Sequence, residues 1–83
     1  MIDQIRQLLD AHGRLQIPAA SLADTQDLYA TGLTSFAAVQ LMLALEESFD
    51  VEFPEHMLNR RSFSSIKSIA DCLHELAATA VTQ

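Results

Sequence analysis

Apolar residues recur every three or four positions near both ends of the chain, which is the spacing of a helix with one buried face. The first such stretch is Ile2–His12, and Gly13 supplies a stop signal after it. A last helix is expected after Ser62–Ser65, whose hydroxyls can cap it. The tail Thr79–Gln83 is expected to fray. The apolar stripe of the last helix consists of Ile66, Ile69, Ala70, Leu73 and Leu76 with Ala77.

The middle of the chain predicts a further long helix and a long connection before it. Residues 35–49 contain no Gly or Pro and are rich in good helix formers. Residues 14–34 hold Pro18, Gly32 and several Ser, Thr and Asp residues, and they are expected to form a long ordered loop. After Pro54, residues Glu55–Asn59 are expected to form one short helix. The pattern therefore predicts a single all-α domain over residues 1–83, a small bundle of three long helices plus one short helix.

The helix expected at 35–49 has apolar residues on both sides. On a helical wheel, one side is expected to form core, and it carries Ala38, Leu41, Met42, Leu45 and Phe49. The opposite stripe is Phe36, Gln40, Leu43 and Glu47, and two of these are large and apolar where a solvated helix normally carries polar groups. Two interpretations are open: the stripe is a docking surface, or the loop 14–34 folds over it.

Charge and cysteine content narrow the function classes. The 83 residues carry 11 acidic and 5 basic side chains, so the net charge of −6 repels nucleic acid and anionic membranes and suits partners with Lys or Arg patches. Cys72 is the only cysteine, and no Cys or His spacing indicates a metal site. No stretch approaches a membrane-spanning length free of charge. A cytoplasmic monomer without a metal is expected.

Ser35 stands where the central helix is expected to begin. Serine at a helix start commonly accepts a hydrogen bond from an unpaired backbone amide, and on local pattern alone this capping role is favoured. A serine hydroxyl is unreactive without a nearby base, and His12, His56 and His74 are all distant in sequence. The chain is therefore not expected to be an enzyme.

The wider pattern around Ser35 resembles the acyl carrier protein family. The resemblance rests on Asp27–Tyr29, Gly32–Ser35, the helix ending at Leu45–Phe49, the exit Val51–Pro54 and the serine-capped last helix. In that family, a phosphopantetheinyl transferase moves 4′-phosphopantetheine from coenzyme A to the serine after Gly-x-x, and the thiol of this arm carries substrates as thioesters. The resemblance implies that Ser35 is the attachment site and that the transferase supplies the chemistry.

Two departures from the common family pattern bear on the partners. Thr34 stands where fatty-acid carriers usually have Asp, and Phe36–Leu45 has no charged residue. Recognition near the arm is therefore expected to be more apolar than electrostatic and less sensitive to salt. The runs Gly32–Leu43 and Phe53–Phe63 resemble small bacterial carriers that are charged by amino acid:carrier protein ligases. This resemblance implies a small amino acid as cargo, with a loading ligase or acyltransferase and a downstream acceptor enzyme as partners.

The sequence also suggests which residues contact partner enzymes and which other functions remain possible. Arg60 and Arg61 are adjacent charges, and such pairs are usually solvated. The resemblance nevertheless raises the prospect that they contact a partner, because the short third helix often lies in carrier interfaces. A small polar cargo needs little shelter, so no deep preformed tunnel is expected. A fatty-acid or polyketide carrier and an unmodified acidic adaptor remain as alternative functions. The candidate docking residues are Thr34, Phe36, Gln40, Leu43, Glu47, Arg60 and Arg61.

Overall fold

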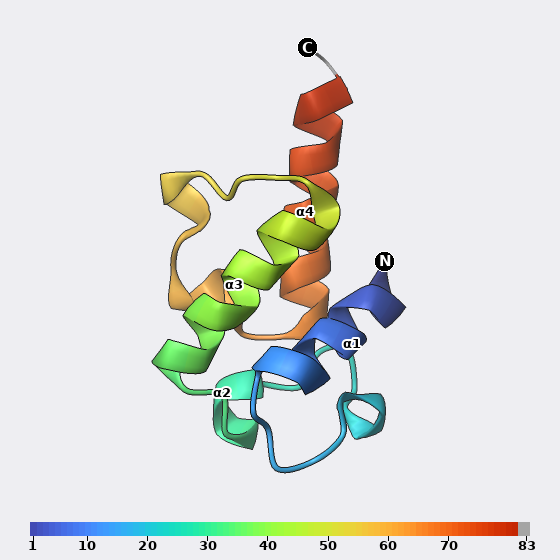
Figure 1. Cartoon of the computed structure of the whole chain (residues 1–83), viewed down its shortest axis with the longest axis vertical. Helices are drawn as coiled ribbons and strands as arrows, with labels where there is room; N and C mark the ends of the chain where they lie inside the picture. The colour runs from blue at the N-terminus through green and yellow to red at the C-terminus, as the bar shows by residue number, and fades with distance from the viewer. Residues whose placement is uncertain (82–83) are drawn as a thin grey trace.

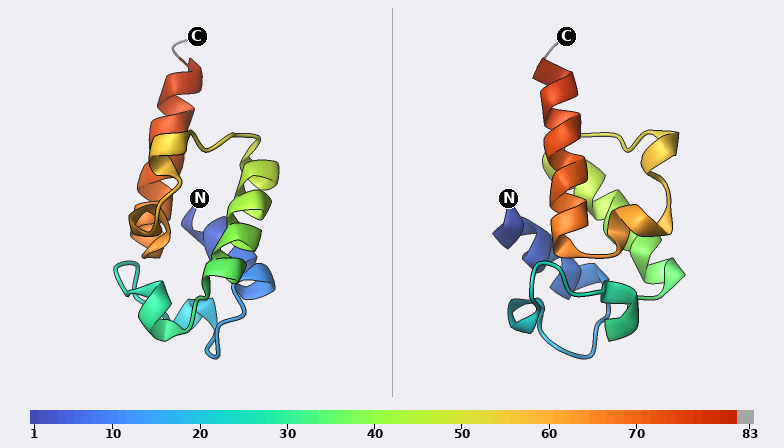
Figure 2. Two further views of the ribbon diagram at one scale, coloured as in Figure 1. Left: turned by 90° about the vertical axis from the view of Figure 1, so that its left-hand side faces the viewer. Right: turned by 180° about the vertical axis from the view of Figure 1, so that it is seen from behind.

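The computed structural model describes residues 1–81, and within this range the secondary structure is entirely helical. The helices are α1 (Ile2–His12), α2 (Leu28–Thr31), α3 (Ser35–Phe49) and α4 (Ile66–Val81), joined by the 3-10 turns η1 (Ala19–Ser21), η2 (Glu55–Met57) and η3 (Arg60–Phe63). Helix α1 packs against both α3 and α4, and the segment carrying η2 and η3 arches from the end of α3 to the start of α4 (Figures 1 and 2). The predicted all-α bundle with three long helices is confirmed.

The core forms where the apolar stripes of these helices meet. The largest fully buried side chains come from α1, α2, α3 and α4: Ile5, Leu9, Leu28, Leu41, Leu45, Ile66, Ile69 and Leu73. On the predicted core face of α3, Met42 and Phe49 are only half-buried, whereas Ala37, which was not predicted, is buried. On α4 the predicted stripe is buried as far as Leu73, but Ala77 is exposed.

The connection between α1 and α3 is ordered, as predicted, but it contains the short helix α2 and the turn η1. The Arg6 guanidinium on α1 donates to the carbonyls of Ala19 and Leu22, the latter at 2.9 Å, and pairs with Asp24. The Leu28 amide donates to the Ser64 carbonyl at 2.8 Å. These bonds hold the connection at the end of the bundle where α3 begins (Figure 1).

Several predicted boundaries also appear in the structure. Helix α1 stops before Gly13, and a β-carbon there would lie 2.7 Å from the Leu9 carbonyl oxygen. Pro54 precedes η2, which is a single 3-10 turn, and η3 follows it without having been predicted. The Ser65 hydroxyl accepts from the Ser68 amide at 3.0 Å and so caps α4.

The C-terminal end differs from the expected frayed tail. Helix α4 continues through Thr79 as far as Val81, while residues 82 and 83 lie outside the described range. None of the helices in residues 1–81 is both long enough and apolar enough to cross a membrane.

Candidate functional site

At the start of α3, the helix cap and the serine expected to carry the arm are two different residues. Gly32 adopts φ 122°, a backbone conformation that favours glycine, and turns the chain from α2 toward α3. The Thr34 hydroxyl then accepts from the Ala37 amide at 3.0 Å, so Thr34 is the capping residue. The local interpretation of Ser35 as the cap is therefore wrong.

Ser35 is the first residue of α3, and its side chain does not cap the helix. The residue is exposed, and its hydroxyl makes no hydrogen bond to any other group in residues 1–81. The first turn of α3 contains no acidic residue, and the amides of Ser35 and Phe36 precede the first intrahelical bond. These amides and the helix dipole favour a negative charge next to the hydroxyl, so the residues present fit a phosphodiester on Ser35.

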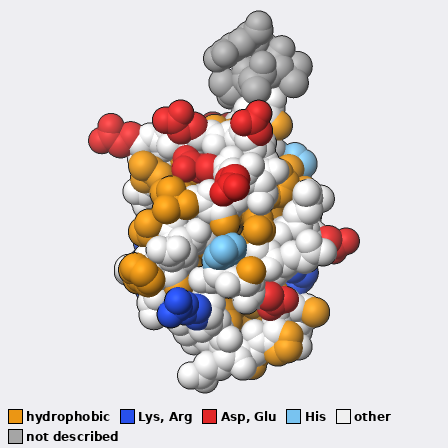
Figure 3. Space-filling view, viewed as in Figure 1, with side chains coloured by type: hydrophobic (Ala, Val, Ile, Leu, Met, Phe, Trp, Pro, Cys, Tyr) orange, Lys and Arg blue, Asp and Glu red, His pale blue; other side chains and the backbone are white. Residues whose placement is uncertain are grey.

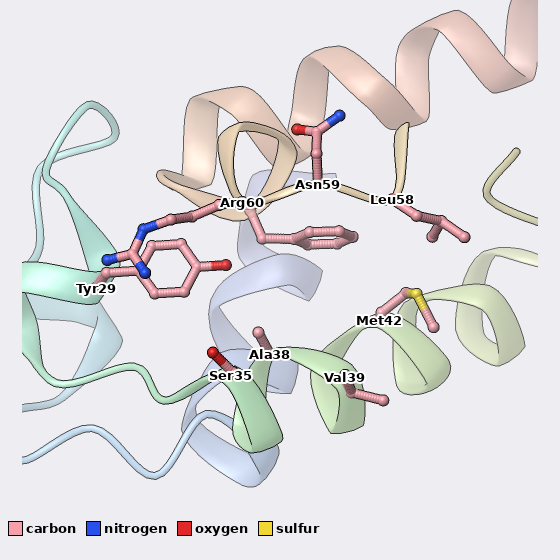
Figure 4. A pocket seen from close by; sticks show the side chains of 9 residues that line it. Tyr29, Ser35, Ala38, Val39, Met42, Leu58, Asn59 and Arg60 are labelled. Carbon is pink, nitrogen blue, oxygen red and sulfur yellow. The ribbon is translucent and has the colours of Figure 1, made fainter. Parts of the chain in front are cut away.

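A groove of about 440 Å³ opens beside Ser35, between α3 and the segment 58–63 (Figure 4). Its walls are mainly apolar, and no His, Asp or Glu lines it, so it offers no general base to Ser35. It is an open groove rather than an enclosed cavity. The lining residues are Tyr29, Ser35, Ala38, Val39, Met42, Leu58, Asn59, Arg60 and Phe63.

Arg60 and Tyr29 form the polar end of this groove. The Arg60 guanidinium carbon lies 4.0 Å from the centroid of the Tyr29 ring, within range of a cation–π interaction (Figure 4). Burial raises the pKa of the Tyr29 phenol above its usual value of 10.0; the charge of Arg60 opposes this rise, and that of Asp27 adds to it. Sequence reasoning did not distinguish Arg60 from Arg61, which lines a different groove beside α4.

The apolar stripe on α3 is exposed. Phe36 retains 65% of its accessible surface and Leu43 retains 51%, so the loop 14–34 does not cover them and that interpretation is wrong. Gln40 and Glu47 are exposed on the same helix. Figure 3 shows hydrophobic side chains gathered along one side of this face of the molecule.

Two further large apolar residues extend this surface. Val39 and Leu58 are exposed to 51% and 49%, and both line the groove next to Ser35. Val39 could have been found, because it lies three residues after Phe36 and four before Leu43 on one helix. Leu58 could not, since only the fold brings it opposite α3. We call Phe36, Val39, Leu43 and Leu58 the apolar patch.

Possible metal ligands do not cluster in the described residues. Among residues 1–81, no group of three or more His, Cys, Asp or Glu residues could hold a metal ion. Cys72 is a half-buried free thiol on α4.

Comparisons with known proteins point to one family. The family described as "Phosphopantetheine attachment site" matches residues 3–73. An aminoacyl carrier protein from Agrobacterium fabrum (strain C58 / ATCC 33970) is 58% identical over 67 residues, which cover 81% of each chain.

Solved structures agree with that match. One is the crystal structure of an engineered Bradyrhizobium japonicum glycine:[carrier protein] ligase complexed with a carrier protein from Agrobacterium tumefaciens and AMP; the match has a TM-score of 0.87 and 54% identity and covers 89% of this chain and 99% of that one. A solution structure from Agrobacterium tumefaciens matches over the full length of both chains, with a TM-score of 0.77 and 48% identity.

Proposed function

Since this chain belongs to the phosphopantetheine-attachment family and, within it, to the aminoacyl carrier proteins, we propose that Ser35 bears its 4′-phosphopantetheine arm and that an amino acid:[carrier protein] ligase loads it. The observation that carries the assignment is that the helix cap at the start of α3 is Thr34 and not Ser35. Thr34 caps the helix, so the exposed Ser35 hydroxyl has no structural partner in the described residues.

The protein's own residues prepare this serine without activating it. The free amides at the start of α3 favour the negative charge of the attached phosphodiester. No base lines the groove, so the phosphopantetheinyl transferase must remove the hydroxyl proton. When bound, 4′-phosphopantetheine supplies a thiol that holds the aminoacyl group as a thioester. The carrier itself then catalyses nothing, and we place it in the cytoplasm with its loading enzyme.

The apolar patch is the surface on which we expect the loading ligase to dock. It is exposed, it begins one residue after Ser35, and it includes Phe36 and Leu43. Exposed patches of this kind typically mark protein–protein contacts. We also include five further exposed residues in the proposed docking surface: Thr34, Gln40, Glu47, Arg60 and Arg61.

Glycine is the proposed cargo. A similar carrier occurs in a complex with a glycine:[carrier protein] ligase, and that carrier shares 54% identity with this chain. A small amino acid also suits an open groove, which would give little shelter to a long acyl chain. The two alternatives, a fatty-acid or polyketide carrier and an unmodified adaptor, receive no support from these relatives.

Intact-protein mass spectrometry tests the proposal directly. Incubation with coenzyme A and a broad-specificity phosphopantetheinyl transferase should add one arm to the native chain and none to Ser35→Ala. Ser48→Ala is the matched control, because Ser48 is another exposed serine on α3 and its variant should be modified normally. Subsequent incubation with ATP, glycine and the Bradyrhizobium japonicum ligase should add one glycyl group to the holo protein.

Two results would contradict the proposal. One is an arm on the Ser35→Ala variant. The other is an unmodified native chain under conditions that modify a known carrier completely.

A further inference from the structure

The basic side chains of this acidic protein are not equivalent. Arg60 makes no ion pair within residues 1–81, and it is the basic side chain that lines the Ser35 groove. No carboxylate lines that groove to compete for it. Two of the other basic residues are already paired, Arg6 with Asp24 at 2.6 Å and Lys67 with Asp71 at 3.1 Å.

The Tyr29 ring holds the Arg60 guanidinium in place. The guanidinium carbon lies 4.0 Å from the ring centroid, and none of the five guanidinium N–H donors has a hydrogen-bond or ion-pair partner within residues 1–81. Tyr29 is half-buried, and its backbone amide donates to the Asp27 carboxylate at 2.9 Å, which holds the residue in the first turn of α2. A stacked arginine with unused donors is pre-organised for an oxyanion, since little side-chain freedom remains to be lost.

The anion expected in this groove is the one carried by Ser35. The Arg60 side chain extends over Tyr29 at the end of the groove where Ser35 begins α3 (Figure 4). Resting on the attachment proposed above, we infer that Arg60 donates hydrogen bonds to the phosphodiester of the phosphopantetheine arm. The arm is then held from two sides, by the amides at the start of α3 and by the Tyr29-supported guanidinium. Arg60 is thus a positioning residue that sets the direction in which the arm leaves Ser35.

Arg61 provides a matched control for this role. It is adjacent to Arg60 on η3, is exposed like Arg60 and carries the same charge. It lines the groove on the α4 side, which contains Asp71 and Glu75 and not Ser35. Replacing Arg61 therefore changes the net charge equally and leaves the proposed contact intact.

The experiment compares holo native protein, holo Arg60→Gln and holo Arg61→Gln. Mass spectrometry first establishes that each carries one arm. The ³¹P chemical shift of the phosphodiester and the ¹H–¹⁵N signals of the arginine Nε–H groups are then recorded for apo and holo forms. We expect the Arg60 Nε–H signal to shift on arm attachment and the Arg61 signal to stay. We also expect the ³¹P shift of holo Arg60→Gln to differ from that of native protein, and the ³¹P shift of Arg61→Gln to match it.

Variants of Tyr29 test whether its ring holds the Arg60 guanidinium in place. Tyr29→Phe keeps the ring and should preserve the native ³¹P shift, whereas Tyr29→Leu should move the shift toward the Arg60→Gln value. An Arg60 Nε–H signal that is identical in apo and holo protein, with the same ³¹P shift in all three fully modified proteins, would overturn the inference. If no protein gains an arm, the mass spectra would refute the attachment at Ser35 itself, and the inference would fall with it.

Discussion

At the scale of single residues, capping and attachment fall on neighbouring positions. Thr34→Ala should destabilise the protein by about 1 kcal/mol, because the Ala37 amide loses its acceptor. Thr34→Asp should retain native stability, since a carboxylate at this position both caps and complements the helix dipole. Ser35→Ala should leave stability nearly unchanged. Urea unfolding of the three apo variants measures this order, and an equal loss for Ser35→Ala would mean that its hydroxyl also supports the helix.

The Tyr29 phenol gives a second test at this scale. Its pKa is raised by burial and held down by Arg60, so Arg60→Gln should raise it further while Arg61→Gln leaves it unchanged. A raised pKa in the folded state means that the unfolded chain loses this proton first. Stability should therefore fall as pH rises above about 10. Ring-proton shifts in an NMR pH titration report the pKa, and a lower value in Arg60→Gln would contradict the assigned sign.

The sequence pattern could locate the start of α3 but not divide these roles. Both Thr34 and Ser35 are good cap residues, and their difference depends on which one adopts the extended backbone before the first helical turn. The resemblance to carriers selected Ser35 for a reason unrelated to helix formation. The stacking of Arg60 on Tyr29 joins residues 31 positions apart, which no local pattern can indicate.

At the scale of elements, α3 has one face for the core and one for partners. Leu45→Ala should cost about 2–5 kcal/mol, because it leaves a cavity in the core. Leu43→Ala should change stability by less than about 0.5 kcal/mol, since Leu43 is exposed. Thermal and urea unfolding of the two variants measures the contrast.

Aminoacylation by the ligase tests the role of the exposed face of α3. Leu43→Glu should fold normally yet raise the KM of the carrier for the ligase about tenfold or more, because it places a charge within the apolar patch. Gln7→Glu, which adds the same charge at an exposed position of α1 outside the proposed docking surface, serves as the control and should have a small effect. Unchanged loading of Leu43→Glu would remove this stripe from the proposed interface.

The long helices were predictable because each carries many periodic positions, and α2 was not. It has only four residues, and it exists because Asp27 caps it and Leu28 is buried in the core. Such a short helix draws its stability from tertiary packing, so its own sequence gives almost no periodic signal. The same holds for η3, whose position is set by Asn59 accepting from the Ser62 amide at 3.0 Å.

At the scale of the whole molecule, acidic side chains are unevenly distributed along α3. Acidic side chains gather toward the end where α3 finishes (Figure 3), whereas α3 carries no acidic residue in its first turn beside Ser35. We expect a roughly tenfold rise in ionic strength to change the KM for loading by less than about threefold, because an apolar contact is poorly screened by salt. Steady-state loading kinetics at several salt concentrations measure this, and a steep loss would indicate an interface dominated by ion pairs.

The placement of Tyr29 also gives the protein an optical reporter of its own site. It is the only tyrosine in a chain without tryptophan, so fluorescence excited at wavelengths that phenylalanine does not absorb arises from this one ring. That ring lies under Arg60, in the groove that contains Ser35. Arm attachment should change its fluorescence intensity, and docking of a tryptophan-containing enzyme should quench it by energy transfer. Both events can then be followed in real time with the native, unlabelled chain.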